Sequence, residues 1–180
     1  MRVMELTVIR TRQGMTPTAG LTPPDTGYVL QVAVVYQDTA TRQWAEQVCG
    51  RMAQVAGLEA IHRTEWKVGD LNASRVFSEG AAALAQADLI VVALYAAERL
   101  PAAFYLWVNV WLQQRAGHPG ALVALLVPPE ASVVEARETR RYLSAVAGQG
   151  HLDFLVQECR QPGTLSPELD EDLLRWTQAA

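Results

Sequence analysis

Three nearly continuous apolar segments constrain the fold of this chain more than any other feature of its sequence. They are Val29–Tyr36 (VLQVAVVY), Asp88–Tyr95 (DLIVVALY) and Ala121–Val127 (ALVALLV). An uninterrupted apolar run of this length is typical of a central strand that is covered on both faces. Strands of that kind occur in parallel sheets with helices on both sides. The chain therefore favours an α/β architecture.

The segment after the first apolar run has the periodicity of a helix. From about Thr41 to Ala56, apolar residues recur at helical spacing, so one face is apolar. Asp38 offers a cap oxygen at its start, and Gly57 stands in the usual position at its end. A helix cap explains Asp38 better than a catalytic or metal-binding carboxylate, because the partners of a receiver-type acidic site are missing. The apolar residues of this face are Trp44, Val48, Met52 and Val55, with Ala45, Cys49 and Ala56 beside them.

The rest of the chain continues the alternation of strands and helices. Residues 60–66 have mixed faces, which suggests a strand at a sheet edge. Further helices are predicted over about 73–86 (capped by Asn72), 102–115, 131–147 and 167–176 (opened by Ser166), and a further strand near 154–159. The order β-α-β-α-β-α-β-α-β-α predicts a single domain. Its fold class is α/β, a three-layer sandwich around a parallel sheet with right-handed crossovers.

The first part of the chain differs from this pattern. Val3–Ile9 alternates well enough for one short strand, and residues 14–27 are rich in proline and glycine, as linkers are. We therefore expect residues 1–27 to form an N-terminal arm or linker, or one strand added to a sheet edge. Residues 28–180 are expected to form the domain.

Composition excludes several classes of function. The net charge is −4, Lys67 is the only lysine, and no basic cluster interleaves with aromatic residues, so no nucleic-acid surface is expected. Residues 87–112 are apolar but broken by charges and Pro101, so no membrane span is expected. The chain shows no signal-peptide pattern. Cys49 and Cys159 lie far apart in the sequence, which favours reduced thiols and a cytoplasmic location.

One stretch of the chain resembles a known family. Residues 87–115 read ADLIVVALYAAERLPAAFYLWVNVWLQQR. The frame of Ala87-Asp88, an apolar strand, Leu100-Pro101 and a helix resembles a signature of the flavodoxin-like NAD(P)H-dependent FMN reductases. The resemblance implies a flavodoxin-like fold with strand order 2-1-3-4-5. It also implies hydride transfer from NAD(P)H to the N5 atom of FMN and on to a flavin or quinone.

The loops that hold flavin in that family are altered in this chain. The segment Gln37–Arg42, after the first strand, has no glycine, whereas the family has a hydroxyl- and glycine-rich phosphate loop there. Leu94–Glu98 replaces a turn that resembles P-E-Y-N-G, and Pro128-Pro129-Glu130 replaces a glycine-rich loop. These departures favour a binding or assembly module without ordinary flavin chemistry. The alternative is an FMN-dependent NAD(P)H oxidoreductase, a flavin or quinone reductase, with an atypical phosphate loop.

A third hypothesis is an enzyme or sensor for another small ligand at the same crevice. Whether the chain is an enzyme is left open, no catalytic residue is assigned, and FMN is the one cofactor that the resemblance suggests. The single, widely spaced histidines His62, His118 and His151 argue against a metal site. The candidate cofactor-binding residues are Thr39, Thr41 and Arg42 in the first loop, and Tyr95, Glu98 and Arg99 beyond the second apolar strand.

The helix predicted over residues 102–115 is apolar nearly all round. Trp107 and Trp111 lie four residues apart, and other apolar residues cover the remaining faces. A helix of this kind must be buried on more than its sheet-facing side. The resembling family often forms dimers near this helix. We therefore expect a homodimer contact through residues 102–115, with the tryptophans in it.

Overall fold

The computed structural model describes residues 27–57, 60–96, 99–128 and 133–179. In this part of the chain, five parallel strands form one sheet in the order β2-β1-β3-β4-β5, which confirms the order expected from the resemblance. β2 lies at an edge, as its mixed faces predict. The strands are β1 (Leu30–Tyr36), β2 (Ile61–Lys67), β3 (Leu89–Tyr95), β4 (Gly120–Val127) and β5 (Leu152–Glu158).

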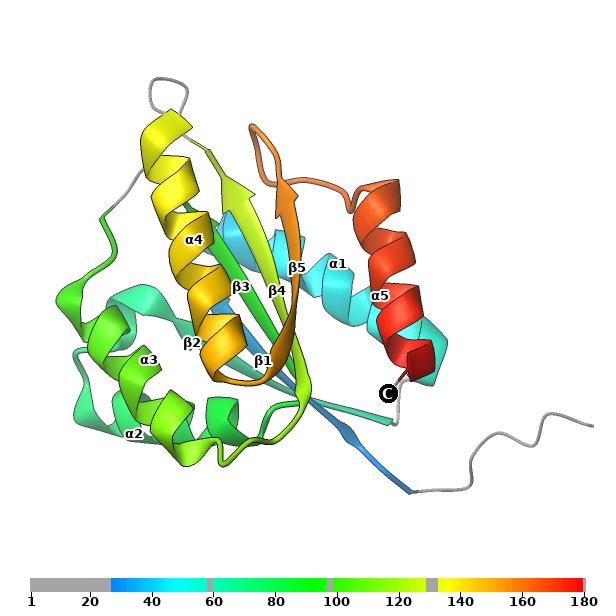
Figure 1. Ribbon diagram of the computed structural model, residues 1–180, viewed down its shortest axis with the longest axis horizontal. Coiled ribbons are helices and arrows are strands. Elements are labelled where there is room, and N and C mark those ends of the chain that lie inside the picture. The colour runs from blue at the N-terminus through cyan, green and yellow to red at the C-terminus, as the bar shows by residue number, and fades with distance from the viewer. Residues whose placement is uncertain (1–26, 58–59, 97–98, 129–132, 180) are drawn as a thin grey trace, which may run out of the picture.

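Helices cover both faces of the sheet (Figure 1). α1 and α5 lie on one face, whereas α2, α3 and α4 lie on the other. These three layers confirm the predicted sandwich. The helices are α1 (Thr39–Ala56), α2 (Ser74–Gln86), α3 (Ala102–Gln114), α4 (Val133–Gln149) and α5 (Pro167–Ala179), with a short 3-10 turn at Val68–Asp70.

Each face of the sheet has its own apolar core, because successive side chains of a strand point to opposite faces. Under α1 and α5, Trp44 and Leu173 belong to the same buried apolar cluster as Val91 of β3. Under α2, α3 and α4, Phe104 belongs to the same buried apolar cluster as Ile90 of β3. Every residue of β3 except Tyr95 is buried, in agreement with the continuous apolar run of this strand.

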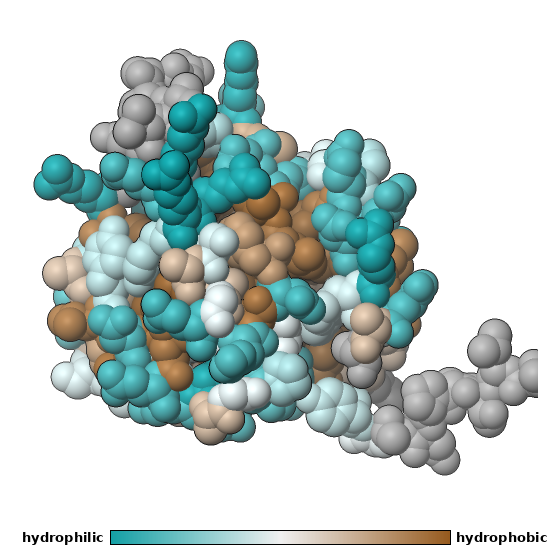
Figure 2. Space-filling view, in the orientation of Figure 1, coloured by the Kyte–Doolittle hydropathy of each residue, from teal (hydrophilic) through white to brown (hydrophobic). Residues whose placement is uncertain are grey.

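The two edges of the sheet differ. β2 carries the polar pattern IHRTEWK, whereas β5 has half-buried apolar residues from Phe154 to Val156. Figure 2 shows this apolar surface over β5, between the hydrophilic side chains of α4 and α5. Charged residues on an edge strand discourage pairing with another sheet. β2 is therefore the better protected edge.

The residues predicted to cap the start of a helix agree with the structure in two of three cases. Asp38 caps α1, and the Ser166 hydroxyl accepts a hydrogen bond from the Leu169 amide at the start of α5 (3.2 Å). The predicted cap at Asn72 is wrong, because Ala73 is the N-cap residue of α2 and no side chain caps that helix. α2 is held instead by its packing, with Gly80 and Leu84 buried.

The tryptophans of α3 belong to the core of the chain itself. Trp107 is 0% and Trp111 2% exposed, so placing them in a contact between two chains is wrong. α2 packs against α3, and the Trp107 indole donates to the Phe77 carbonyl (3.0 Å). The large apolar side chains of α3 that stay exposed are Tyr105 and Leu106. Among the described residues, no helix is long and apolar enough to cross a membrane.

Candidate functional site

The first candidate site is the loop between β1 and α1, at the carboxyl end of the sheet. Asp38 accepts a hydrogen bond from the Thr41 amide (2.9 Å), and the Thr41 hydroxyl in turn accepts one from the Asp38 amide (2.9 Å). This reciprocal arrangement is a capping box, in which two side chains satisfy amides that the first helical turn leaves open. The carboxylate of Asp38 therefore caps the start of α1.

Thr41 is enclosed by this arrangement. It is 0% exposed, and its hydroxyl accepts from the Gln37 amide (3.1 Å) as well as from the Asp38 amide. The same hydroxyl lies within hydrogen-bonding distance of the Asp38 carboxylate (2.9 Å), to which it can donate. The donors and acceptors of Thr41 are thus engaged inside the loop.

Tyr95 ties the same loop to the end of β3. Its backbone amide donates to the side-chain oxygen of Gln37 (2.5 Å), and its hydroxyl bonds to the Asp38 carboxylate. Partial burial raises the pKa of Asp38, but hydrogen bonds from the amide and hydroxyl of Thr41, from Tyr95 and from the Ala40 amide outweigh it. The pKa of Asp38 is therefore below its ordinary value, and the carboxylate is negatively charged at neutral pH.

The other predicted residues lie apart from this cluster. Arg42 donates to the Glu65 carboxylate on β2 (2.7 Å) and lies 3.5 Å from Glu46. Thr39 is the exposed first residue of α1, and Arg99 is exposed in the loop before α3. Glu98 lies outside the described residues. The structure thus brings Thr41 and Tyr95 together around Asp38, and it places Arg42 against β2.

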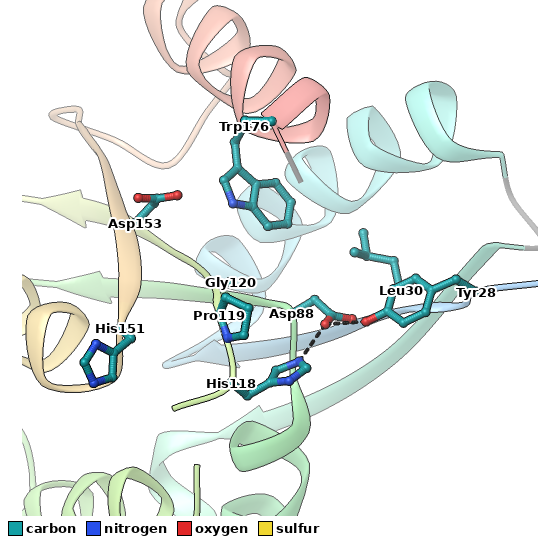
Figure 3. A pocket seen from close by; sticks show the side chains of 10 residues that line it. Tyr28, Leu30, Asp88, His118, Pro119, Gly120, His151, Asp153 and Trp176 are labelled. Atoms are coloured by element: carbon teal, nitrogen blue, oxygen red, sulfur yellow. Dashed lines mark hydrogen bonds and ion pairs between the residues drawn. The ribbon is translucent and has the colours of Figure 1, made fainter. Parts of the chain in front are cut away.

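Sequence reasoning missed a second cluster, at the opposite end of the sheet. Asp88, which is 7% exposed, precedes β3 and accepts from the Tyr28 hydroxyl (2.6 Å) and the Gln31 amide (2.7 Å). The Nε2 atom of His118 lies 2.9 Å from the same carboxylate (Figure 3). The hydrogen bond to Asp88 raises the pKa of Tyr28 to about 12. Asp88, directly before β3, therefore connects the start of β1 and the segment before β4 to its own segment.

This cluster forms one wall of a hollow of about 550 Å³. In Figure 3 the Trp176 ring lies on the side opposite His118 and Pro119, and Asp153 lies beside it. The only sequence signal for the site was a carboxylate directly before an apolar strand. The described lining residues are Tyr28, Leu30, Asp88, His118, Pro119, Gly120, His151, Asp153, Trp176 and Ala179.

The residues that the structure describes include no group of three or more His, Cys, Asp or Glu side chains that could hold a metal ion. Cys49 is buried and Cys159 partly buried, and both are free thiols. Burial raises the pKa of the Cys49 thiol. A buried thiol with a raised pKa is protonated and unreactive.

No protein-family model matches the sequence, and no curated protein matches it. Solved structures do match the fold. A short-chain flavodoxin associated with a bacterial microcompartment is 13% identical, with 84% of this chain and 99% of that chain covered and a TM-score of 0.54. An oxidoreductase from Corynebacterium diphtheriae is 16% identical, with 83% and 92% covered and a TM-score of 0.53.

A third structure is the NAD(P)H:quinone oxidoreductase from Methanothermobacter marburgensis. It is 12% identical, with 84% of this chain and 97% of that chain covered and a TM-score of 0.50. At these identities the likeness establishes the fold alone. The chain has a divergent flavodoxin-like fold, with the sheet order expected from the sequence.

Proposed function

We propose that this chain is a binding or assembly module with a flavodoxin-like fold that does not carry out ordinary flavin chemistry. The observation that carries the proposal is the capping box of α1. The first amides of a helix are the usual site for a phosphate at this end of an α/β sheet. Here the Asp38 carboxylate takes the hydrogen bonds of the Thr41 and Ala40 amides.

The charge and the contacts around Asp38 also oppose a phosphate. Its carboxylate would lie beside a second anion, and like charges at short range repel. Thr41 has no hydroxyl proton or lone pair directed to solvent, since it is buried and bonded within the loop. Arg42, the remaining cation of the loop, is engaged by Glu65 and Glu46. The described residues of this loop therefore do not fit the phosphate of FMN.

The alternative is an FMN-dependent NAD(P)H oxidoreductase with an atypical phosphate loop. It is favoured by the likeness of the fold to two oxidoreductase structures. For this function Thr39, Thr41 and Arg42 would have to hold the phosphate, and Tyr95, Glu98 and Arg99 would have to line the flavin. Such binding requires Asp38 to leave the amides that it now caps.

A flavin titration separates the two functions. We expect the purified full-length protein to be colourless and to leave the fluorescence of added FMN unchanged at micromolar concentrations. The reason is that the amides at the start of α1 are already satisfied. A flavodoxin measured under the same conditions serves as the positive control, since it quenches FMN emission. Yellow protein or quenching at sub-micromolar concentration would contradict the proposal and lead to an assay of NAD(P)H oxidation.

We further propose that the assembly is a homodimer through the exposed face of α3. Leu106 is 61% and Tyr105 41% exposed, although both are large and apolar. Apolar side chains of this size gather at interfaces between chains. The tryptophans of this helix are not part of the contact, because they are buried within each chain.

Leu106→Glu tests this contact. We expect the variant to sediment as a single chain where the natural protein sediments as two, because a carboxylate in an apolar interface is costly to bury. Gln86→Glu, an exposed change on α2, is the matched control and should leave the mass unchanged. A natural protein with the mass of one chain, or a Leu106→Glu protein with the mass of two, would remove α3 as the interface.

A further inference from the structure

The hollow at the amino end of the sheet has features of a small-molecule site, and its location differs from that of the first loop. We propose that it binds a small organic cation, with Asp153 as the counter-charge and the Trp176 ring as the aromatic contact. This inference goes beyond the proposed function, because it concerns the opposite end of the sheet. It stands whether or not FMN binds at the carboxyl end.

The size and the walls of the hollow suit a small ligand. Its volume is about 550 Å³, within the range of roughly 300–1,000 Å³ that is usual for such sites. A smaller hollow of about 310 Å³ also has Asp153, Trp176 and Ala179 in its lining. The two hollows thus meet around Trp176. A ligand with a charged group at one end and an extended body can occupy both.

The hollow is ready formed, because Asp88 holds its wall in place. The carboxylate joins Tyr28, the start of β1 at Gln31, and His118 just before β4. Figure 3 shows Tyr28 and His118 converging on Asp88 from different segments. A wall that is fixed before binding lowers the entropic cost of holding a ligand. The carboxylate of Asp88 is already engaged in these hydrogen bonds, so Asp88 supports the wall of the hollow and does not bind the ligand.

The charge of the lining favours a cation. The described residues of the larger hollow include the carboxylates of Asp88 and Asp153, the imidazoles of His118 and His151, and no lysine or arginine. The smaller hollow adds Asp172 and Arg175, which pair with each other. The side chain of Asp153 has no hydrogen bond or ion pair with any described residue. In contrast, Asp170 and Asp172 on α5 are paired with Arg51 and Arg175. Asp153 is thus the carboxylate that remains available to a ligand.

Trp176 supplies the second element of recognition. Its side chain extends from α5 to the edge of the hollow, next to Asp153 (Figure 3). It is 9% exposed, so packing against the core holds the ring in one position. Tryptophan is the aromatic residue that attracts cations most strongly. A carboxylate beside an indole ring matches an ammonium group that carries an apolar body.

The test uses the full-length protein and benzyltrimethylammonium as the probe. The NMR signal of the Trp176 indole N–H, assigned through Trp176→Phe, should shift in a saturable manner as the probe is added. Asp153→Asn should weaken binding by about tenfold, because it removes the counter-charge from the hollow. Glu171→Gln removes one charge from α5 at an exposed position outside the lining, and it should not change the affinity.

Three results would overturn the proposal. They are no saturable shift up to millimolar probe, the same affinity in Asp153→Asn as in the natural protein, or tighter binding of benzenesulfonate, an anion of similar size. Asp153 is exposed, so its replacement leaves the core untouched and the variant is expected to fold. Isothermal titration calorimetry of the same proteins gives the affinities independently of the NMR signal.

Discussion

Replacing Arg115 with methionine is expected to lower the free energy of unfolding by about 3–5 kcal/mol. Arg115 follows α3 and is 2% exposed. Its guanidinium group donates to the carbonyls of Leu84 (3.0 Å), Gly150 (3.2 Å) and Pro119 (3.3 Å). It therefore ties the ends of α2 and α4 to the segment before β4. Methionine fills much of the same space but leaves these carbonyls without their donor.

Burial lowers the pKa of Arg115, although arginine stays charged at neutral pH. Urea unfolding followed by circular dichroism measures the effect. Arg75→Met is the control, because the Arg75 side chain is 86% exposed and pairs only with Glu79 on the same helix. We expect that control to change stability by less than about 0.5 kcal/mol. If Arg115→Met lowered the free energy of unfolding by less than about 1 kcal/mol, water would be able to donate hydrogen bonds to the three carbonyls in place of the guanidinium group.

Replacing Trp107 with alanine is expected to cost about 3–5 kcal/mol, since it opens a large cavity between α2 and α3. The ring is 0% exposed and lies against Gly80, where an added Cβ would lie 2.8 Å from the Cζ2 atom of the indole. Its N–H also satisfies the Phe77 carbonyl (3.0 Å). The lost packing and the lost hydrogen bond act in the same direction.

The dependence of this loss on protein concentration decides where the ring is buried. If Trp107 packs within one chain, the loss relative to the natural protein is the same at all protein concentrations. If two chains bury it, the loss changes with concentration. Gln114→Ala is the matched control on the same helix, because Gln114 is exposed and lies beyond the proposed contact at Tyr105 and Leu106. A Trp107→Ala protein as stable as this control would contradict the packing described here.

The pattern of the sequence determined the strands and most of the helix ends, whereas the order of the strands was implied by the resemblance to a known family. A continuous apolar run such as that of β3 is shielded from water only if both faces of the strand are covered, so β3 had to lie inside a parallel sheet. Asp38 and Gly57 marked the ends of α1, because capping depends on residues close together in the chain. The mixed faces of β2 likewise placed it at an edge.

Other features depended on contacts between distant segments. Tyr28 and Asp88 are 60 residues apart, and Asp88 and His118 are 30 apart, so neither pair had a sequence signal. The histidines appeared isolated because spacing along the chain does not report distance in the fold. The candidate phosphate residue Thr41 was placed correctly in α1, but only the structure showed its hydroxyl inside the capping box.

The surroundings of α3 also separate what the sequence predicts from what only the tertiary structure decides. Its sequence is apolar nearly all round, which required cover on several sides without specifying what provides it. In the tertiary structure α2 covers Trp107, with Gly80 leaving room for the ring, and Arg115 is buried between helix ends. Local sequence decides which side chains must avoid water. Only the packing of distant elements decides whether another helix, a second chain or a ligand covers them.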